Sequence, residues 1–302
     1  MSGSVTLEQA ARIEIRGRRL PAVLEWTWRF MRRKPLGFIG AVIIVLLALL
    51  AITAPLSAPY SPTEIHAADR LQGPSPRYLM GTDNLGRDIF SQIVWGARIS
   101  MYVGFAAVLL SITAATLIGV VSGYFGGRLD ATMQRLVDAV IALPGIFLIL
   151  TIMAILGPGM NNVIFALAVG GAASNSRVIR SATLALKEMT YVEAARVVGS
   201  SHLRIIFVHL LPNVMPAAIT LATLGLGAAI LAEASLSFLG LGVPPPNPSW
   251  GSMLSGAGRR FMLQAPWMAF FPGLFLSLAV FGFNMLGDAL RDLLDPRLRG
   301  FR

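Results

Sequence analysis

Residues 36–54 read LGFIGAVIIVLLALLAITA, a run without Asp, Glu, Lys or Arg. A helix needs about 20 mostly apolar residues to cross the hydrocarbon core of a bilayer. The rest of the chain is similarly poor in charge: of its 302 residues, 55% are hydrophobic and 13% are charged. A soluble globular domain carries about 25% charged residues. The sequence therefore predicts an integral membrane protein whose surface largely faces lipid.

Further charge-free runs predict five more membrane-spanning helices. The segment 139–176 is too long for one crossing and contains Gly157-Pro158-Gly159, a strong turn signal, so we expect two helices joined there by a tight hairpin. The second of these, roughly 161–180, is rich in Gly, Ala and Ser, which allow close helix packing. The remaining spans are expected within 99–127, 205–232 and 261–287. The predicted fold class is an all-α membrane protein with six transmembrane helices.

The distribution of basic residues predicts the orientation of these helices. Six crossings place both termini on one side, and Lys and Arg concentrate in cytoplasmic loops. With the N-terminus inside, 19 of the 25 Lys and Arg residues fall in cytoplasmic segments and six fall outside. We therefore expect an N-in, C-in topology. The first 35 residues are mostly polar and end in Arg32-Arg33-Lys34, so they are interpreted as a cytoplasmic segment rather than a cleavable signal.

Several classes of site are excluded or disfavoured by composition. The chain has no cysteine, which rules out disulfides and thiolate metal sites, and its three histidines are scattered. The formal net charge of +10 arises from residues between apolar blocks, which fits membrane orientation better than nucleic-acid binding. A Walker A loop requires Gly-Lys-Ser/Thr, and neither Lys34 nor Lys187 follows a glycine. The chain is thus expected to bind no nucleotide, metal or cofactor and to have no catalytic residue.

Two outer segments, 57–98 and 240–266, are rich in proline and glycine. The second contains Pro244-Pro245-Pro246, which cannot continue a regular helix. Both segments are open to two interpretations, as surfaces for an external partner or as ordered connections. In the segment 57–98, Asp83 and Asn84 are expected to bond to their own backbone in a turn rather than to contact substrate.

A polar stretch from Lys187 to Arg204 separates the fourth and fifth spans. Residues 191–198 suit a short helix in which Glu193, near the start, complements the helix dipole. Ala194 and Ala195 are small enough for another surface to approach, and Gly199 can adopt the left-handed conformation that ends a helix. The stretch is predicted to be a compact helix–turn–helix at the membrane surface that can dock into a groove of a partner.

The spacing within this stretch resembles the signature of permease subunits of binding-protein-dependent ABC importers, which is Glu-Ala-Ala, three residues, Gly, nine residues and Ile-x-Leu-Pro. Matching positions are Glu193, Ala194, Ala195, Gly199, Leu211 and Pro212. The sequence departs from the signature at His209, and His209-Leu210-Leu211-Pro212-Asn213 looks like the variant of the peptide-transport branch.

Other segments resemble the C-type permease subunits of dipeptide, oligopeptide and nickel importers. These are Gly81-Thr82-Asp83 followed by Gly86-Arg87-Asp88, the segment 233–242, Asn284 to Asp288, and Leu294 to Arg297. The resemblance runs from about residue 25 to the end. It implies the type I ABC importer fold, with a cytoplasmic segment 1–35, a first helix 36–56, an external loop 57–98, a five-helix core 99–290 and a cytoplasmic tail 291–302.

The resemblance also implies partners and a mechanism. A second, homologous permease subunit would complete the pathway as a heterodimer, and an extracytoplasmic binding protein would deliver substrate. One or two ATPase subunits would bind ATP and Mg²⁺ below the bacterial inner membrane. The helix between the fourth and fifth spans would couple to the ATPase through Tyr191, Glu193, Ala194, Ala195, Arg196 and Gly199, with Leu211 and Pro212 at the start of the next span.

Substrate and rival functions stay open at this point. Short peptides are favoured over nickel or another small solute, since His66 alone is weak support for metal. A secondary transporter driven by an ion gradient is the main rival, and an integral membrane enzyme is a more distant one. No internal repeat or ionisable relay within the spans supports the former. Glu233, expected near the outer face, has either a structural role or a role in gating substrate.

Overall fold

The computed structural model describes residues 34–294, and the regular elements in that part of the chain are helices, apart from an isolated bridge between Thr82 and Asp88. This confirms the all-α class. Most of the expected N-terminal segment 1–35 and most of the tail 291–302 lie outside the described residues. The long helices are α3 (Pro35–Ile52), α5 (Ile89–Phe125), α8 (Met160–Lys187), α11 (Leu211–Phe238) and α14 (Trp267–Leu294). The shorter elements are α4 (Ala54–Ser57), η1 (Ala67–Asp69), α6 (Gly127–Ile141), α7 (Gly145–Leu156), α9 (Thr190–Val197), α10 (His202–Arg204), η2 (Ile205–Leu210), α12 (Trp250–Leu254) and α13 (Gly256–Arg260).

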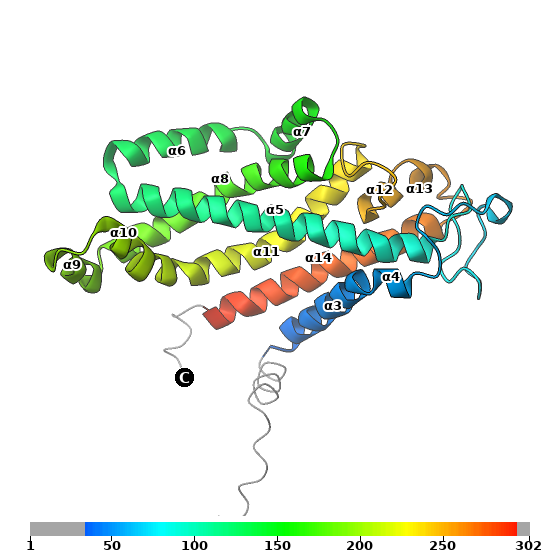
Figure 1. Ribbon diagram of the computed structural model, residues 1–302, viewed down its shortest axis with the longest axis horizontal. Coiled ribbons are helices and arrows are strands. Elements are labelled where there is room, and N and C mark those ends of the chain that lie inside the picture. Colours follow the sequence, from blue (N-terminus) through cyan, green and yellow to red (C-terminus); the bar gives the residue numbers. More distant parts are fainter. Residues whose placement is uncertain (1–33, 295–302) are drawn as a thin grey trace, which may run out of the picture.

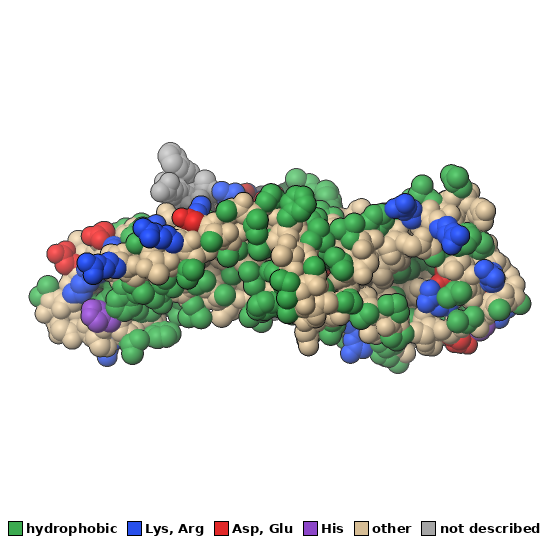
Figure 2. Space-filling model, turned by 90° about the horizontal axis from the view of Figure 1, so that it is seen from above, with side chains coloured by type: hydrophobic (Ala, Val, Ile, Leu, Met, Phe, Trp, Pro, Cys, Tyr) green, Lys and Arg blue, Asp and Glu red, His purple; other side chains and the backbone are tan. Residues whose placement is uncertain are grey.

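The long helices form an elongated bundle with different structures at its two ends (Figure 1). Helix α5 runs through the middle, α3 and α14 lie side by side along one edge, and α6 and α7 lie along the other. One end, which we call the knob end, carries α9 and α10. The other, the cap end, carries residues 58–88 with α12 and α13. Figure 2 shows charged side chains mainly toward both ends and a mostly hydrophobic surface between them, the pattern expected of a membrane-embedded bundle.

Helices α5 and α8 pack closely because small residues line their contact. A Cβ added to Gly119 of α5 would lie 2.7 Å from the Cβ of Ile179, and one added to Gly123 would lie 2.9 Å from the Cβ of Thr183. Such distances allow no side chain larger than hydrogen. Small residues one turn apart let membrane helices approach backbone to backbone. The expectation that the fourth span packs closely is thus confirmed.

Four described helical segments are long and apolar enough to cross a bilayer: α3, α5, His202–Phe238 and most of α14. The pair α6 and α7, bent by 88°, provides a fifth candidate if it is one span. Helix α8 is 28 residues long but carries Arg177, Arg180 and Lys187 in its second half. The structure therefore supports a multi-pass helical membrane protein.

The predicted third span differs most from the structure. Instead of one helix beginning at residue 139, α6 and α7 meet at a sharp bend next to Pro144. Proline has no backbone N–H and disfavours helix in the residue before it, which explains the break. The predicted hairpin after α7 is confirmed, with Gly157 at φ 78° between α7 and α8.

The bounds of other helices also differ from the prediction, and several helices continue past charged residues that end the apolar runs. Helix α5 begins at Ile89, so the expected external loop 57–98 contains its first turns. Arg98, which directly precedes the apolar run 99–127, lies over the ring of Trp95. Helix α8 continues to Lys187, and the fifth helical segment runs from His202 to Phe238. The sixth begins later than predicted, at Trp267 directly after Pro266.

Candidate functional site

The expected helix over 191–198 is present as α9 (Thr190–Val197), with Glu193 in its first turn. Residues 189–204, which we call the knob, form α9, a turn and α10 beyond the knob ends of α5 and α8. Gly199 has φ 80°, as predicted. Its N–H bonds to the carbonyl of Arg196, and the N–H of Ser200 bonds to that of Ala195. This pair of bonds is the Schellman arrangement, in which a left-handed glycine ends the helix and reverses the chain.

A small apolar core fixes the knob to the bundle. Val192 is fully buried in a cluster with Val120 and Tyr124 of α5 and Ile205 of η2. The hydroxyl of Tyr124 also lies 2.8 Å from Nδ1 of His202, at hydrogen-bond distance. Through these contacts, α9 and α10 both pack against α5, the longest α-helix in the described part of the chain.

The outer face of the knob is exposed and partly apolar. Val197 and Val198 are 83% and 84% exposed, and Leu203 is 68% exposed. Glu193 and Ala194 are exposed beside them, and Ala195 is half-buried. Adjacent, highly exposed apolar side chains at a polar end of a protein indicate a surface that a partner covers. The other two predicted coupling residues of α9 also contact the bundle. The Arg196 guanidinium lies 5.7 Å from the ring centroid of Tyr124, and the ring centroid of Tyr191 lies 6.2 Å from that of His209.

Leu211 and Pro212 lie at the root of the knob, where α11 begins. The six preceding residues, Ile205–Leu210, form a π-helical segment. Pro212 cannot donate a backbone hydrogen bond, and a wider turn before it is a common local adjustment. The Asn213 side chain donates to the carbonyl of His209 across 2.6 Å, which strengthens this junction. The structure thus brings the predicted coupling residues together, whereas Glu233 lies 21 residues after Pro212, about 32 Å along the helix.

Glu233 is fully buried at the cap end, among serine hydroxyls. Ser237 donates to Oε1 across 2.7 Å and Ser100 of α5 donates to Oε2 across 3.1 Å. Ser249 donates to the Ser237 hydroxyl, and the Trp250 N–H lies 3.4 Å from the Ser100 oxygen. The side chain points into the bundle and links α5, α11 and the start of α12, contacts that were not predicted from the sequence.

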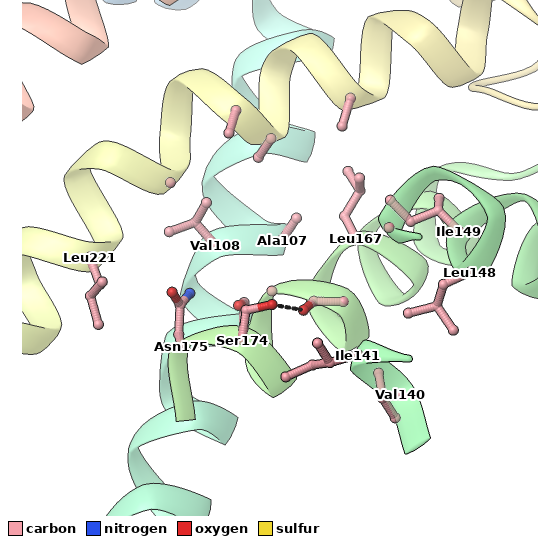
Figure 3. Close-up of a pocket in the computed structure, with 18 of the residues that line it drawn as sticks. Ala107, Val108, Val140, Ile141, Leu148, Ile149, Leu167, Ser174, Asn175 and Leu221 are labelled. Carbon is pink, nitrogen blue, oxygen red and sulfur yellow. Dashed lines mark hydrogen bonds between the residues drawn. The ribbon is translucent and has the colours of Figure 1, made fainter. Parts of the chain in front are cut away.

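A cavity of about 450 Å³ lies between α5, the α6–α7 bend, α8 and α11. Side chains from all four walls point into it (Figure 3). Its lining is mostly apolar, with polar side chains only at Ser111, Ser174 and Asn175, and no lining residue is charged. Such a lining suits a neutral group better than a metal ion or an isolated charge.

Two ion pairs hold α6 against α8 beside this cavity. Arg180 pairs with Asp130 through both its Nε and a terminal nitrogen, with 2.6 Å from Nε to the carboxylate. Arg177 pairs with Asp138 nearer the bend. Asp130 and Arg180 are 13% and 31% exposed, whereas Asp138 and Arg177 are 57% and 49% exposed. The first pair is therefore the stronger restraint on α6.

The cap contains a compact polar cluster outside the helices. The buried Tyr78 hydroxyl donates to Asp69 across 2.7 Å, and Arg77 lies 3.2 Å from the same carboxylate. The hydrogen bond from Tyr78, together with the charge of Arg77, lowers the pKa of Asp69. Burial, followed by the bond to Asp69, raises the pKa of Tyr78 to about 12. Asp83 bonds to the N–H groups of Leu85 and Arg87, so the predicted turn is confirmed for that residue.

Sequence reasoning missed the cavity residues and the partners of Glu233. The contact between Glu233 and Ser237 was predictable from the sequence, because residues four apart lie on the same face of a helix. Ser100 is 133 residues away from Glu233 and Asp130 is 50 residues away from Arg180, so no local pattern connects them. The adjacent pairs Gly170-Gly171 and Ser174-Asn175 were a weak signal for a polar opening in the fourth span.

Comparison with known proteins extends these observations to a family. Residues 115–300 match the family model "Binding-protein-dependent transport system inner membrane component", and residues 25–74 match "N-terminal TM domain of oligopeptide transport permease C". The fold is similar to that of the inward-facing MetNI methionine ABC transporter, with a TM-score of 0.54 and 20% identity over 68% of this chain and 96% of that one.

Relatives of similar length agree with this match. The chain is 44% identical over 280 residues to the dipeptide transport system permease protein DppC of Alkalihalophilus pseudofirmus, covering 92% of both. It is 42% identical over 274 residues to the glutathione transport system permease protein GsiD of Escherichia coli O157:H7, covering 90% of both. The chain therefore belongs to the inner-membrane permease components of binding-protein-dependent ABC transport systems.

Proposed function

We propose that this permease imports short peptides, that its knob receives the motion of an ATPase subunit, and that a second permease subunit completes the pathway. The observation that carries the proposal is the exposed, partly apolar knob anchored through Val192 and Tyr124 to the longest helix. The similarity to dipeptide and glutathione permeases favours peptides over nickel. The lining of the cavity contains no charged side chain to balance a divalent metal ion, which disfavours nickel.

The proposed topology has six crossings, formed by α3, α5, the bent pair α6–α7, α8, the His202–Phe238 segment and α14, with both termini in the cytoplasm. It is supported by the basic residues of the knob end, such as Arg196 and Arg204, which outnumber those of the cap. A pair of introduced thiols tests it, because the chain has no cysteine. A membrane-impermeant maleimide should label Leu79→Cys in intact cells and Val197→Cys only after permeabilisation. Labelling of Val197→Cys from outside would reject the orientation.

Glu233 is proposed to act in gating by holding α12 closed over the cap end. Its carboxylate accepts from α5 and α11, and the Ser249–Ser237 bond continues the chain of contacts to the start of α12. Breaking these bonds would free α12 from α5 and α11 together. An outward opening for substrate delivered by the external receptor would then form at this end.

Reconstitution tests the function as a whole. The permease should co-purify with an ATPase subunit and a second permease, and the complex in proteoliposomes should accumulate labelled dipeptide only with ATP and the receptor. An ion gradient without ATP should drive no uptake. ATP-driven uptake of nickel but not of peptides would reject the substrate, and gradient-driven uptake by this chain alone would reject the mechanism.

A further inference from the structure

Ser111 has a buried hydroxyl without a hydrogen-bond partner in the described part of the chain. Its side chain is only 5% exposed and forms part of the cavity wall on α5. Leaving a buried hydroxyl unpaired costs about 1–3 kcal/mol. The other buried serines in the described part of the chain are paired, as Ser176 is with the carbonyl of Ala173. A buried polar group without a partner at a cavity is a candidate for binding what enters the cavity.

On α8, Gly171 lies directly against this hydroxyl, with Asn175 on the other side of the glycine. A Cβ added to Gly171 of α8 would lie 2.5 Å from the Ser111 oxygen, so a side chain at residue 171 would occupy the space beside the hydroxyl. Asn175 lies one turn further along α8, and Figure 3 shows its carboxamide in the space that Val108 and Leu221 also line. Hydroxyl and carboxamide can each both donate and accept.

These two groups match the chemistry of a peptide bond. A main-chain amide offers one N–H donor and one carbonyl acceptor and carries no charge. The rest of the lining is mostly apolar and uncharged, and a volume of about 450 Å³ lies within the usual range for small-molecule sites, about 300–1,000 Å³. We propose that Ser111 and Asn175 form a transient binding site for a main-chain amide of the peptide in transit. This inference rests on the proposed peptide-import function.

Uptake by the complete complex, with receptor and ATPase, tests the site. The probes are labelled Ala-Ala-Ala and its analogue methylated on the amide nitrogen of the second residue. Losing one neutral hydrogen bond should slow uptake of Ala-Ala-Ala about 2- to 10-fold in Ser111→Ala and in Asn175→Ala. The matched control Ser176→Ala, which removes a hydroxyl already bonded to Ala173, should not change uptake. In both site variants, uptake of the methylated peptide should fall by a smaller factor than uptake of Ala-Ala-Ala, because the methylated amide has already lost its N–H donor.

A chemical probe provides a second measurement in case a variant lowers the amount of folded complex. Ser111→Cys introduces the only thiol of the chain, and a bromoacetyl dipeptide should alkylate it, detected from the mass of this chain. Excess Ala-Ala-Ala should slow the alkylation, and Ser176→Cys should stay unmodified. Wild-type uptake in both site variants, or alkylation that the tripeptide does not slow, would overturn the site. A wild-type complex that imports no peptide would instead reject the proposed function, and this site with it.

Discussion

Ser100 donates a hydrogen bond to the carboxylate of Glu233 across 3.1 Å, joining α5 to α11 at the end of the bundle opposite the knob. Both side chains are fully buried, and the bonding continues to α12 through the Trp250 N–H. The knob contacts the same two helices, α5 through Tyr124 and α11 through its root at Leu211. The two ends of the molecule thus share two long helices, and we propose that motion passes between the ends through them.

Replacing Glu233 should loosen the cap end. In Glu233→Ala the hydroxyls of Ser100 and Ser237 lose their acceptor, and a buried unpaired group costs about 1–3 kcal/mol. We expect a lower Tm of the purified complex, measured by thermal unfolding, and faster proteolysis in residues 239–266. Glu233→Gln keeps the shape and an acceptor oxygen, so it should recover most of the loss.

Ser235→Ala is the matched control, since its hydroxyl bonds only within α11, to the carbonyl of Leu231. If Glu233→Ala has the same Tm and proteolysis pattern as this control, the carboxylate does not hold α12.

The two ion pairs between α6 and α8 should contribute unequally. Asp130→Ala breaks a bidentate, half-buried pair and should destabilise the complex by about 1.5–3 kcal/mol. Asp138→Ala breaks an exposed pair and should cost less than about 1 kcal/mol. Chemical denaturation of the two variants measures the difference. The exchanged pair Asp130→Arg with Arg180→Asp should be more stable than either single change, and equal stability of all three would contradict the pairing.

Alkaline pH should loosen the cap through Tyr78. Its pKa is raised to about 12 in the folded protein, from an ordinary value near 10. The folded state then holds more protons than the unfolded state between these values, so stability falls as pH rises through this window. Limited proteolysis of residues 58–88 should accelerate from pH 10 to 12 in the wild type and depend less on pH in Tyr78→Phe. If Tyr78→Phe leaves the pH dependence of proteolysis unchanged, other titrating groups cause the loosening of the cap.

How much the sequence predicts depends on the range of each interaction. The knob was predictable to within a residue, because a short polar helix ending at Gly199 depends on local signals. The existence of the long helices was predictable from composition. Their ends were not, since Arg98 and Arg177 lie within helices that a search for uncharged runs cuts short.

The α6–α7 bend and the buried Glu233 were missed for a different reason. Helix α6 carries four charged residues and looks like a loop in hydropathy, yet two of them, Asp130 and Asp138, pair with α8. These partners are distant in sequence and meet only after the bundle has formed. Burial of Glu233 likewise depends on serines from three separate segments.

The most direct measurement of the central claim compares dipeptide uptake and ATP hydrolysis in Glu193→Arg with those in Glu188→Arg. Both changes reverse an exposed acidic residue, but only Glu193 lies on α9. We predict that Glu193→Arg assembles into the complex yet loses uptake and the stimulation of ATP hydrolysis by the receptor, while Glu188→Arg keeps both. Normal ATP-driven uptake in Glu193→Arg would contradict the coupling role of the knob.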